Sequence, residues 1–397
     1  MSRILREFLS YGLIIFLGLS CTPKEEKKLN VDQILQESAE QYSYMSSLLE
    51  EDRFPTTYEN GKLKSSRSDW WCSGFYPGTL LYLYEATQNP ELLAEVKRIL
   101  VPLEKEKNNT GTHDLGFMMF CSFGNAHRIS PADSLKEIIR TSSVSLSTRF
   151  DPAIGCIRSW DPAPWNSKWQ YPVIIDNMMN LEMLLWSAAE FNIDSLKQIA
   201  VTHADTTLKN HFRKDFSSYH VVSYDTLTGQ VEMKNTDQGY ADESSWARGQ
   251  AWGLYGYTVM YRYTKDPKYL TQATGIADYI LNHPNLPADK VPYWDFNAPD
   301  IPEADRDASA AAIMASALLE LTDLAKNKEY FVAAEQMLST LSSEVYRGAP
   351  QTNGGFILKH SVGNMPDGNE VDVPLSYADY YYVEALMRYK NRKSKES

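Results

Sequence analysis

The chain has 397 residues, 43% of them hydrophobic and 12% aromatic, so it is long enough to bury a large core and is not compositionally disordered. Its net charge of -12 at pH 7 leaves no basic stripe for neutralising phosphates, which argues against a nucleic-acid partner. An anionic ligand is therefore expected to be short and to be held by a few local cations.

The N-terminus has the features of a processing signal. Arg3 and Arg6 precede the apolar run Tyr11 to Leu19, which is too short for a comfortable membrane span and is followed closely by Cys21. This pattern resembles a bacterial lipoprotein signal, in which Cys21 is the lipidated first residue of the mature protein. We therefore expect an exported lipoprotein of a Gram-negative bacterium, facing the periplasm or lying on the outer-membrane surface, with the lipid on Cys21 as its only membrane contact.

Helical periodicity dominates the rest of the chain. Apolar residues recur at spacings of three and four, which predicts about a dozen helices. In chain order these are Val31 to Leu49, Gly78 to Thr87, Pro90 to Lys105, Leu115 to Ala126, Ser134 to Thr148, Asp176 to Phe191, Ser195 to His211, Ala247 to Tyr263, Pro267 to Leu281, Ala308 to Lys326, Glu329 to Glu344 and Tyr377 to Arg388. Several come in successive pairs, which favours helical hairpins repeated around a centre, a toroid of inner and outer helices. An open helical solenoid is the alternative.

Strand signals are confined to one place. Tyr219 to Tyr224 and Gln230 to Met233 flank the turn Asp225 to Gly229, which predicts a small β-hairpin in a loop between helices. No further domain boundary is visible in the mature region. The sequence thus predicts a signal peptide (1–20), a tether (21–30), one large domain (31–390) and a charged tail (391–397).

The cysteines and histidines give no sign of a metal centre. Cys72, Cys121 and Cys156 are odd in number and have no C-x-x-C spacing, so we expect three buried small side chains. The seven histidines include no H-E-x-x-H motif, so a zinc hydrolase has little support.

Two aspartates precede or open predicted helices. Asp114 and Asp176 both stand where an N-capping residue is expected, and from spacing alone capping is the more frequent role. Asp176, however, is flanked by Ile175 and Met178, and apolar surroundings raise the pKa of a carboxyl group so that it holds a proton near neutrality. Two nearby carboxyl groups are also the basic equipment of acid-base chemistry on sugars.

The segment Gln238 to Trp252 combines aromatic, amide and guanidinium side chains in one place. Aromatic faces cover the C–H patches of a pyranose, amides bind hydroxyls, and Arg248 offers a fork to a carboxylate. Arg248 and Trp252 lie four residues apart and so share one helical face. The alternatives are a salt bridge for Arg248 and an ordinary aromatic core for the segment.

Other candidates are weaker on their own. His220 alternates with apolar residues in the predicted hairpin and is as readily an interior imidazole as a ligand-binding one. Trp71 belongs to an aromatic loop that suits either a stacking platform or a packed corner. Tyr377 opens a tyrosine cluster that is more typical of core than of a site, and Asp307 before small residues indicates a structural N-cap.

Six motifs together resemble the unsaturated glucuronyl hydrolases of glycoside hydrolase family 88. They are HDLGF at 113, DNMMNL at 176, QGYADESSWARGQAW at 238, PYWDF at 292, DASAAA at 307 and YADYYYVEAL at 377. The resemblance implies an all-α (α/α)6 barrel and no metal ion or organic cofactor. It implies hydration of the C4=C5 bond of an unsaturated uronic acid at the end of glycosaminoglycan fragments that a lyase has produced, by a monomer or weak dimer.

Matching the motifs residue by residue implies roles for individual side chains. Asp176 corresponds to the general acid and base, and Asp114 to the second acid, which holds sugar hydroxyls and stabilises positive charge at C5. The implied substrate-binding residues are Trp71, His113, His220, Gln238, Arg248, Trp252 and Tyr377. An unsaturated rhamnogalacturonyl hydrolase acting on pectin fragments is the nearest alternative, and a non-catalytic oligosaccharide-binding lipoprotein is the second.

Overall fold

The computed structural model of the chain describes residues 29–396. Within that range the helices are α1 (Val31–Leu48), α2 (Phe75–Thr87), α3 (Pro90–Leu103), α4 (Asn125–Ile129), α5 (Asp133–Ser147), α6 (Leu181–Phe191), α7 (Asp194–Asn210), α8 (Ala247–Thr264), α9 (Pro267–Asn282), α10 (Ala308–Ala325), α11 (Lys328–Leu341) and α12 (Ser376–Glu396). A π-helix, Gly116–Gly124, leads into α4, and a 3-10 segment, Ile175–Asn180, leads into α6.

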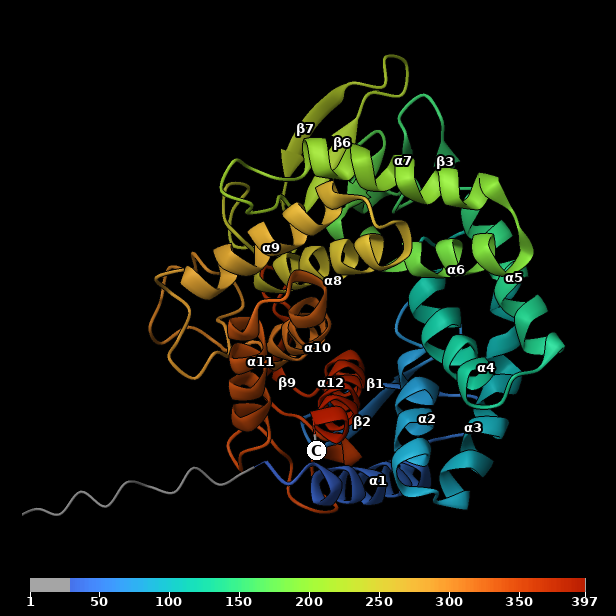
Figure 1. The fold of residues 1–397 in the computed structure, drawn as a ribbon, viewed down its shortest axis with the longest axis vertical. Helices are drawn as coiled ribbons and strands as arrows, with labels where there is room; N and C mark the ends of the chain where they lie inside the picture. Colours follow the sequence, from blue (N-terminus) through green and yellow to red (C-terminus); the bar gives the residue numbers. More distant parts are fainter. Residues whose placement is uncertain (1–28, 397) are drawn as a thin grey trace, which may run out of the picture.

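The helices form two concentric rings (Figure 1). The inner ring is α2, the π-helix with α4, the 3-10 segment with α6, then α8, α10 and α12, and each member contacts the next. Because α12 also contacts α2, the ring closes. Helices α1, α3, α5, α7, α9 and α11 lie outside it. The predicted (α/α)6 barrel is confirmed, and an open solenoid is excluded because its two end helices would not meet.

The distribution of buried residues along each helix agrees with its place in the inner or the outer ring. Helix α8 buries 14 of its 18 residues and α10 likewise 14 of 18, as expected of helices surrounded by protein on all sides. Helix α9 buries only 6 of 16, all on one stripe that faces inward. Helix α10 is long and apolar enough to cross a membrane, but 78% of that stretch is buried inside the barrel, which is typical of a core helix.

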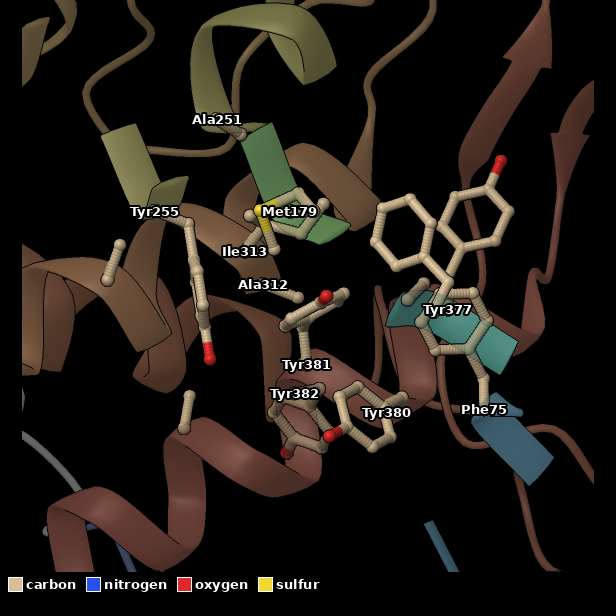
Figure 2. Close-up of a cluster of buried hydrophobic side chains, with 14 of the residues drawn as sticks. Phe75, Met179, Ala251, Tyr255, Ala312, Ile313, Tyr377, Tyr380, Tyr381 and Tyr382 are labelled. Atoms are coloured by element: carbon tan, nitrogen blue, oxygen red, sulfur yellow. The ribbon is translucent and has the colours of Figure 1, made fainter. Parts of the chain in front are cut away.

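The centre of the barrel is filled by large side chains. Figure 2 shows Tyr380 and Tyr381 of α12 on the side of Phe75 of α2, with ring centroids 5.4 and 6.0 Å from that of Phe75. The hydroxyl of the buried Tyr382 lies 2.7 Å from that of Ser342. The tyrosine cluster is therefore core, as the sequence indicated. Asp379 accepts hydrogen bonds from the backbone N–H groups of Ile357 and Leu358 at 2.9 Å each, so it ties a distant loop to α12.

The expectation of a single hairpin is wrong in extent. The predicted hairpin is present as β6 (Val221–Tyr224) and β7 (Val231–Asn235), with β5 (Pro172–Ile174) added to the same sheet. Three further two-stranded sheets pair β1 (Phe54–Glu59) with β2 (Lys62–Ser66), β3 (Phe150–Asp151) with β4 (Cys156–Ile157), and β8 (Ser361–Asn364) with β9 (Asn369–Val373). These strands have two to six residues, too few to show a clear alternation.

The last helix is longer than the sequence predicted. Helix α12 continues to Glu396, so residues 391–396 of the expected charged tail are helical. The predicted signal peptide and Cys21 lie outside the described residues. The cysteines at 72, 121 and 156 are free, as expected, although Cys121 is only partly buried.

Candidate active site

The two aspartates lie on neighbouring segments of the inner ring. Asp114 lies two residues before the π-helix, and Asp176 lies inside the 3-10 segment. These segments touch: the Asn180 side chain accepts a hydrogen bond from the Phe117 N–H at 3.1 Å. A Cβ on Gly116 would lie 2.5 Å from the Asn180 Cα, so only glycine allows this approach.

Neither aspartate caps a helix, so the role that spacing alone favoured is wrong. The N-cap position before α6 is Asn180, and that of the 3-10 segment is Ile174. The Asp114 side chain binds the Thr112 hydroxyl and the His113 ring instead of a backbone amide. Asp176 Oδ2 is buried without a hydrogen-bond partner among residues 29–396.

The surroundings of Asp176 favour a protonated carboxyl group. Its side chain is only 13% exposed, and burial raises its pKa to about 7, against a smaller opposing effect of the Arg248 charge. His220 Nε2 lies 3.7 Å from Asp176 Oδ2. His220 Nδ1 accepts hydrogen bonds from the backbone N–H groups of Asp237 and Gln238, at 3.1 and 3.2 Å, so Nε2 carries the proton in the neutral ring.

Asp114 is perturbed in the same direction. Burial raises its pKa to about 7, and the charge of Asp176 adds to the effect. His113 Nε2 lies 3.0 Å from Asp114 Oδ1, and burial holds the pKa of His113 well below its usual value. Neutral His113 donates to the Asp114 carboxylate in the tautomer that carries the proton on Nε2. The two carboxyl groups have similar pKa values, and the charge of Asp176 reaches Asp114.

Aromatic side chains connect the other expected residues into one wall. Ring centroids lie 4.6 Å apart for His220 and Trp246, 4.9 Å for Trp71 and Tyr377, and 5.1 Å for Phe117 and Trp252. The remaining links are Trp71 to Phe117 at 5.6 Å, and Arg248 over Trp246 at 4.5 Å and over Tyr377 at 5.3 Å. The structure thus connects seven of the nine expected residues by direct contacts, and Asp114 with its partner His113 joins them through the charge interaction of Asp114 with Asp176.

Arg248 is held firmly by the protein. One terminal nitrogen donates to Asp307 at 3.3 Å and to the Val362 carbonyl, and the other donates to Gln238 and to the Gly363 carbonyl at 2.6 Å each. Among residues 29–396, no acceptor binds the Nε–H of Arg248. The salt bridge that the sequence left as an alternative for Arg248 is present. A substrate carboxylate would therefore meet a guanidinium whose terminal nitrogens already donate hydrogen bonds.

Sequence reasoning did not single out three aromatic residues of this cluster. Trp246 and Phe117 complete the wall, and Trp160 lies against His220 with ring centroids 6.1 Å apart. Asp307 was expected to be an N-cap, and its side chain does accept from the Ser309 N–H. It also pairs with Arg248, a contact that no local pattern reveals.

The site defines a class of protein. Two largely buried carboxyl groups with pKa values near neutrality, beside an aromatic wall in a helical toroid, suit proton transfer to a sugar. Such a pair is the equipment of an enzyme that breaks glycosidic linkages.

Comparison with known proteins identifies the family. No family model matches the chain. An unsaturated glucuronyl hydrolase of Formosa agariphila is 49% identical over 81% of this chain and 80% of its own length. An unsaturated chondroitin disaccharide hydrolase of Streptococcus agalactiae is 33% identical over 91% of this chain and 92% of its own. A crystal structure of an unsaturated glucuronyl hydrolase specific for heparin matches with a TM-score of 0.89 and 47% identity, over 92% of this chain and 98% of that one.

The chain belongs to the unsaturated glucuronyl hydrolases, a group of glycoside hydrolases.

Proposed function

We propose that this protein removes the 4,5-unsaturated uronic acid from glycosaminoglycan oligosaccharides by hydrating the C4=C5 bond, with Asp176 as the general acid and base. The Asp176 proton passes to C4, and the resulting carboxylate takes a proton from the water that adds to C5. The hemiketal formed at C5 then collapses and releases the remaining sugar. One carboxyl group serves both proton transfers, because it is regenerated at the end of the second.

The observation that carries the proposal is the state of Asp176. Its pKa of about 7 leaves a large fraction protonated near neutrality, and its buried Oδ2 has no hydrogen-bond partner in residues 29–396. An unpaired buried oxygen has a cost that structural aspartates avoid, and a proton donor needs such an atom free for its substrate. The neutral His220 at 3.7 Å adds a donor on the same side.

The other residues have supporting roles in this proposal. Asp114 binds sugar hydroxyls and, when ionised, stabilises positive charge developing at C5. Trp71 and Tyr377 cover the apolar face of the unsaturated ring. Arg248 keeps Gln238 in place through the 2.6 Å hydrogen bond and supplies positive charge near the substrate carboxylate.

A panel of unsaturated disaccharides tests the proposal. Disaccharides from heparin come first, because the solved structure at 47% identity is that of an enzyme specific for heparin. Chondroitin, dermatan and hyaluronan products follow, with and without sulfate. We expect ultraviolet absorbance of the conjugated bond to fall on addition of enzyme. Activity on pectin-derived products alone would support a rhamnogalacturonyl hydrolase, and binding of every disaccharide without absorbance loss would support a non-catalytic binder.

The pH dependence of kcat/KM provides a second test. Asp176 must start protonated, so activity is expected to fall as pH rises through about 7. Asp114 must be ionised, so activity is also expected to fall as pH drops below about 7. The expected profile is a narrow bell centred near neutrality, whose two apparent pKa values belong to the pair. A profile flat from pH 5 to 9 would contradict the roles given to both carboxyl groups.

We also propose that Cys21 is lipidated and anchors the protein to a membrane facing the periplasm or the cell surface. The support is the sequence alone: Arg3 and Arg6, an apolar run and a cysteine followed by a charged segment. Labelling cells with a radioactive fatty-acid precursor is expected to label the wild type and to leave Cys21→Ala unlabelled. Equal labelling of both proteins, or of neither, would contradict the anchor.

A further inference from the structure

Trp165 is a large apolar side chain held out in solvent. It is 61% exposed and lies on a short 3-10 turn, Pro164–Asn166. The buried Asn166 fixes this turn, since its side chain accepts from the Ala163 N–H at 2.8 Å and donates to the Asp161 carbonyl at 2.9 Å. Proline at 162 and 164 restricts the backbone further. The Trp165 ring is therefore presented by a stiff turn rather than by a flexible loop.

The exposed ring is the outer end of a row of aromatic side chains that begins at the active site. The Trp160 ring lies 6.1 Å from the His220 ring, and Trp165 lies 5.2 Å from Trp160. Trp160 is also supported by the buried Trp169 at 5.3 Å. A single exposed apolar side chain needs no explanation, but one that continues a row of rings leading away from His220 does.

A cation accompanies the exposed ring. Lys168 lies exposed on the same loop, with its amino group 4.2 Å from the centre of the Trp169 ring. No ion pair of Lys168 is present among residues 29–396, and its charge only partly offsets the burial that raises the pKa of Asp237. In a chain of net charge -12, an exposed lysine without an ion pair, three residues from Trp165 on the same loop, offers local positive charge to an anion.

We propose that Trp165 and Lys168 form a distal subsite, which binds a sugar ring and its acidic substituent beyond the first saccharide released from the unsaturated unit. The inference rests on the proposed function, because it needs the unsaturated ring at Asp176 and the rest of the oligosaccharide leading outward past Trp160. Its ligands are unsaturated acidic oligosaccharides of four or more units. The stiff turn lowers the entropy lost on stacking, so binding is gained without new contacts at the reacting atoms.

The test compares two chain lengths. Steady-state kinetics are measured on an unsaturated disaccharide and an unsaturated tetrasaccharide of the same glycosaminoglycan, with wild type, Trp165→Ala and Leu227→Ala. Leu227 is the control, because it is 94% exposed on the turn between β6 and β7. Trp165→Ala is expected to raise KM for the tetrasaccharide roughly three- to ten-fold, with kcat and the disaccharide constants unchanged, which is the usual size of one aromatic contact.

Lys168→Gln tests the cation in the same assay. It is expected to raise KM for a sulfated tetrasaccharide at low salt, and the difference from wild type is expected to vanish at 1 M salt, where exposed charges are screened. No effect of Trp165→Ala on the tetrasaccharide, an equal effect on both lengths, or a wild type that hydrates only the disaccharide would overturn the subsite. Those three results leave the proposed function intact, whereas a wild type inactive on every length contradicts the proposed function and the subsite with it.

Discussion

Replacing Asp176 by Asn is expected to lower kcat by roughly 10²- to 10⁴-fold, the usual contribution of a general acid and base, with KM for the disaccharide changed only a few-fold. The amide has nearly the size and shape of the carboxyl group but carries no acidic proton for C4. Absorbance loss at the unsaturated bond under saturating substrate measures the effect. A variant that hydrates substrate at the wild-type rate would remove Asp176 from the mechanism.

Thermal unfolding of the same variant separates catalysis from folding. The Asp176 pKa is raised from 3.8 to about 7 in the folded protein, so the folded state binds this proton more tightly than the unfolded state does. The stability that the protonated carboxyl group provides is present below about pH 4 and is lost as pH rises through about 7. Asn is neutral at every pH, so Asp176→Asn is expected to unfold roughly 1–3 °C above wild type at pH 8, with a smaller difference at pH 5. A lower midpoint at pH 8 would show that the ionised group stabilises the fold.

The long helices could be predicted from the sequence, because burial of a helix face requires apolar residues at a regular spacing. Helices α7 and α8 begin and end within one residue of the expected bounds, since apolar spacing and loop residues agree there. The π-helix Gly116–Gly124 could not be predicted from the sequence, because it depends on contacts with residues far away in the chain. A Cβ on Gly74 would lie 2.1 Å from the Phe117 carbonyl oxygen, and Asn180 holds the Phe117 N–H. No local pattern records contacts of that kind.

The candidate site, like the fold, could be predicted from the sequence only in part. Asp176 stands out because apolar neighbours around an aspartate are chemically unusual, yet spacing alone favoured capping for both Asp114 and Asp176. The residues raised acid-base chemistry as the alternative, and the resemblance assigned each carboxyl group its role. Trp246 and Phe117 could not be distinguished from core residues, because an aromatic residue in or beside a buried helix gives the same sequence pattern whether it packs the core or lines a site. The β1–β2 hairpin could have been predicted from the dipeptide Asn60-Gly61. These two residues adopt the positive φ angles, 52° and 75°, that a tight hairpin turn requires.

Arg248 is the point at which fold and site depend on each other. It comes from α8, while its partners Val362 and Gly363 belong to β8 and Asp307 precedes α10. Arg248 is 3% exposed and Asp307 0%, so removing one charge leaves the other buried without its partner. The guanidinium in turn lies against Tyr377. Loss of the pair therefore affects both stability and the position of the substrate-facing side chains.

Asp307→Ala is accordingly expected to lower the free energy of unfolding by about 3–5 kcal/mol, of which about 1 kcal/mol is the lost helix cap. Urea denaturation measures the change. Asp307→Asn separates the two parts, because the amide oxygen can still accept from the Ser309 N–H while the charge is gone. Glu137→Ala is the matched control: its exposed pair with Arg140 is expected to contribute no more than about 1 kcal/mol. If Asp307→Ala costs no more than Glu137→Ala, the buried pair with Arg248 does not stabilise the fold.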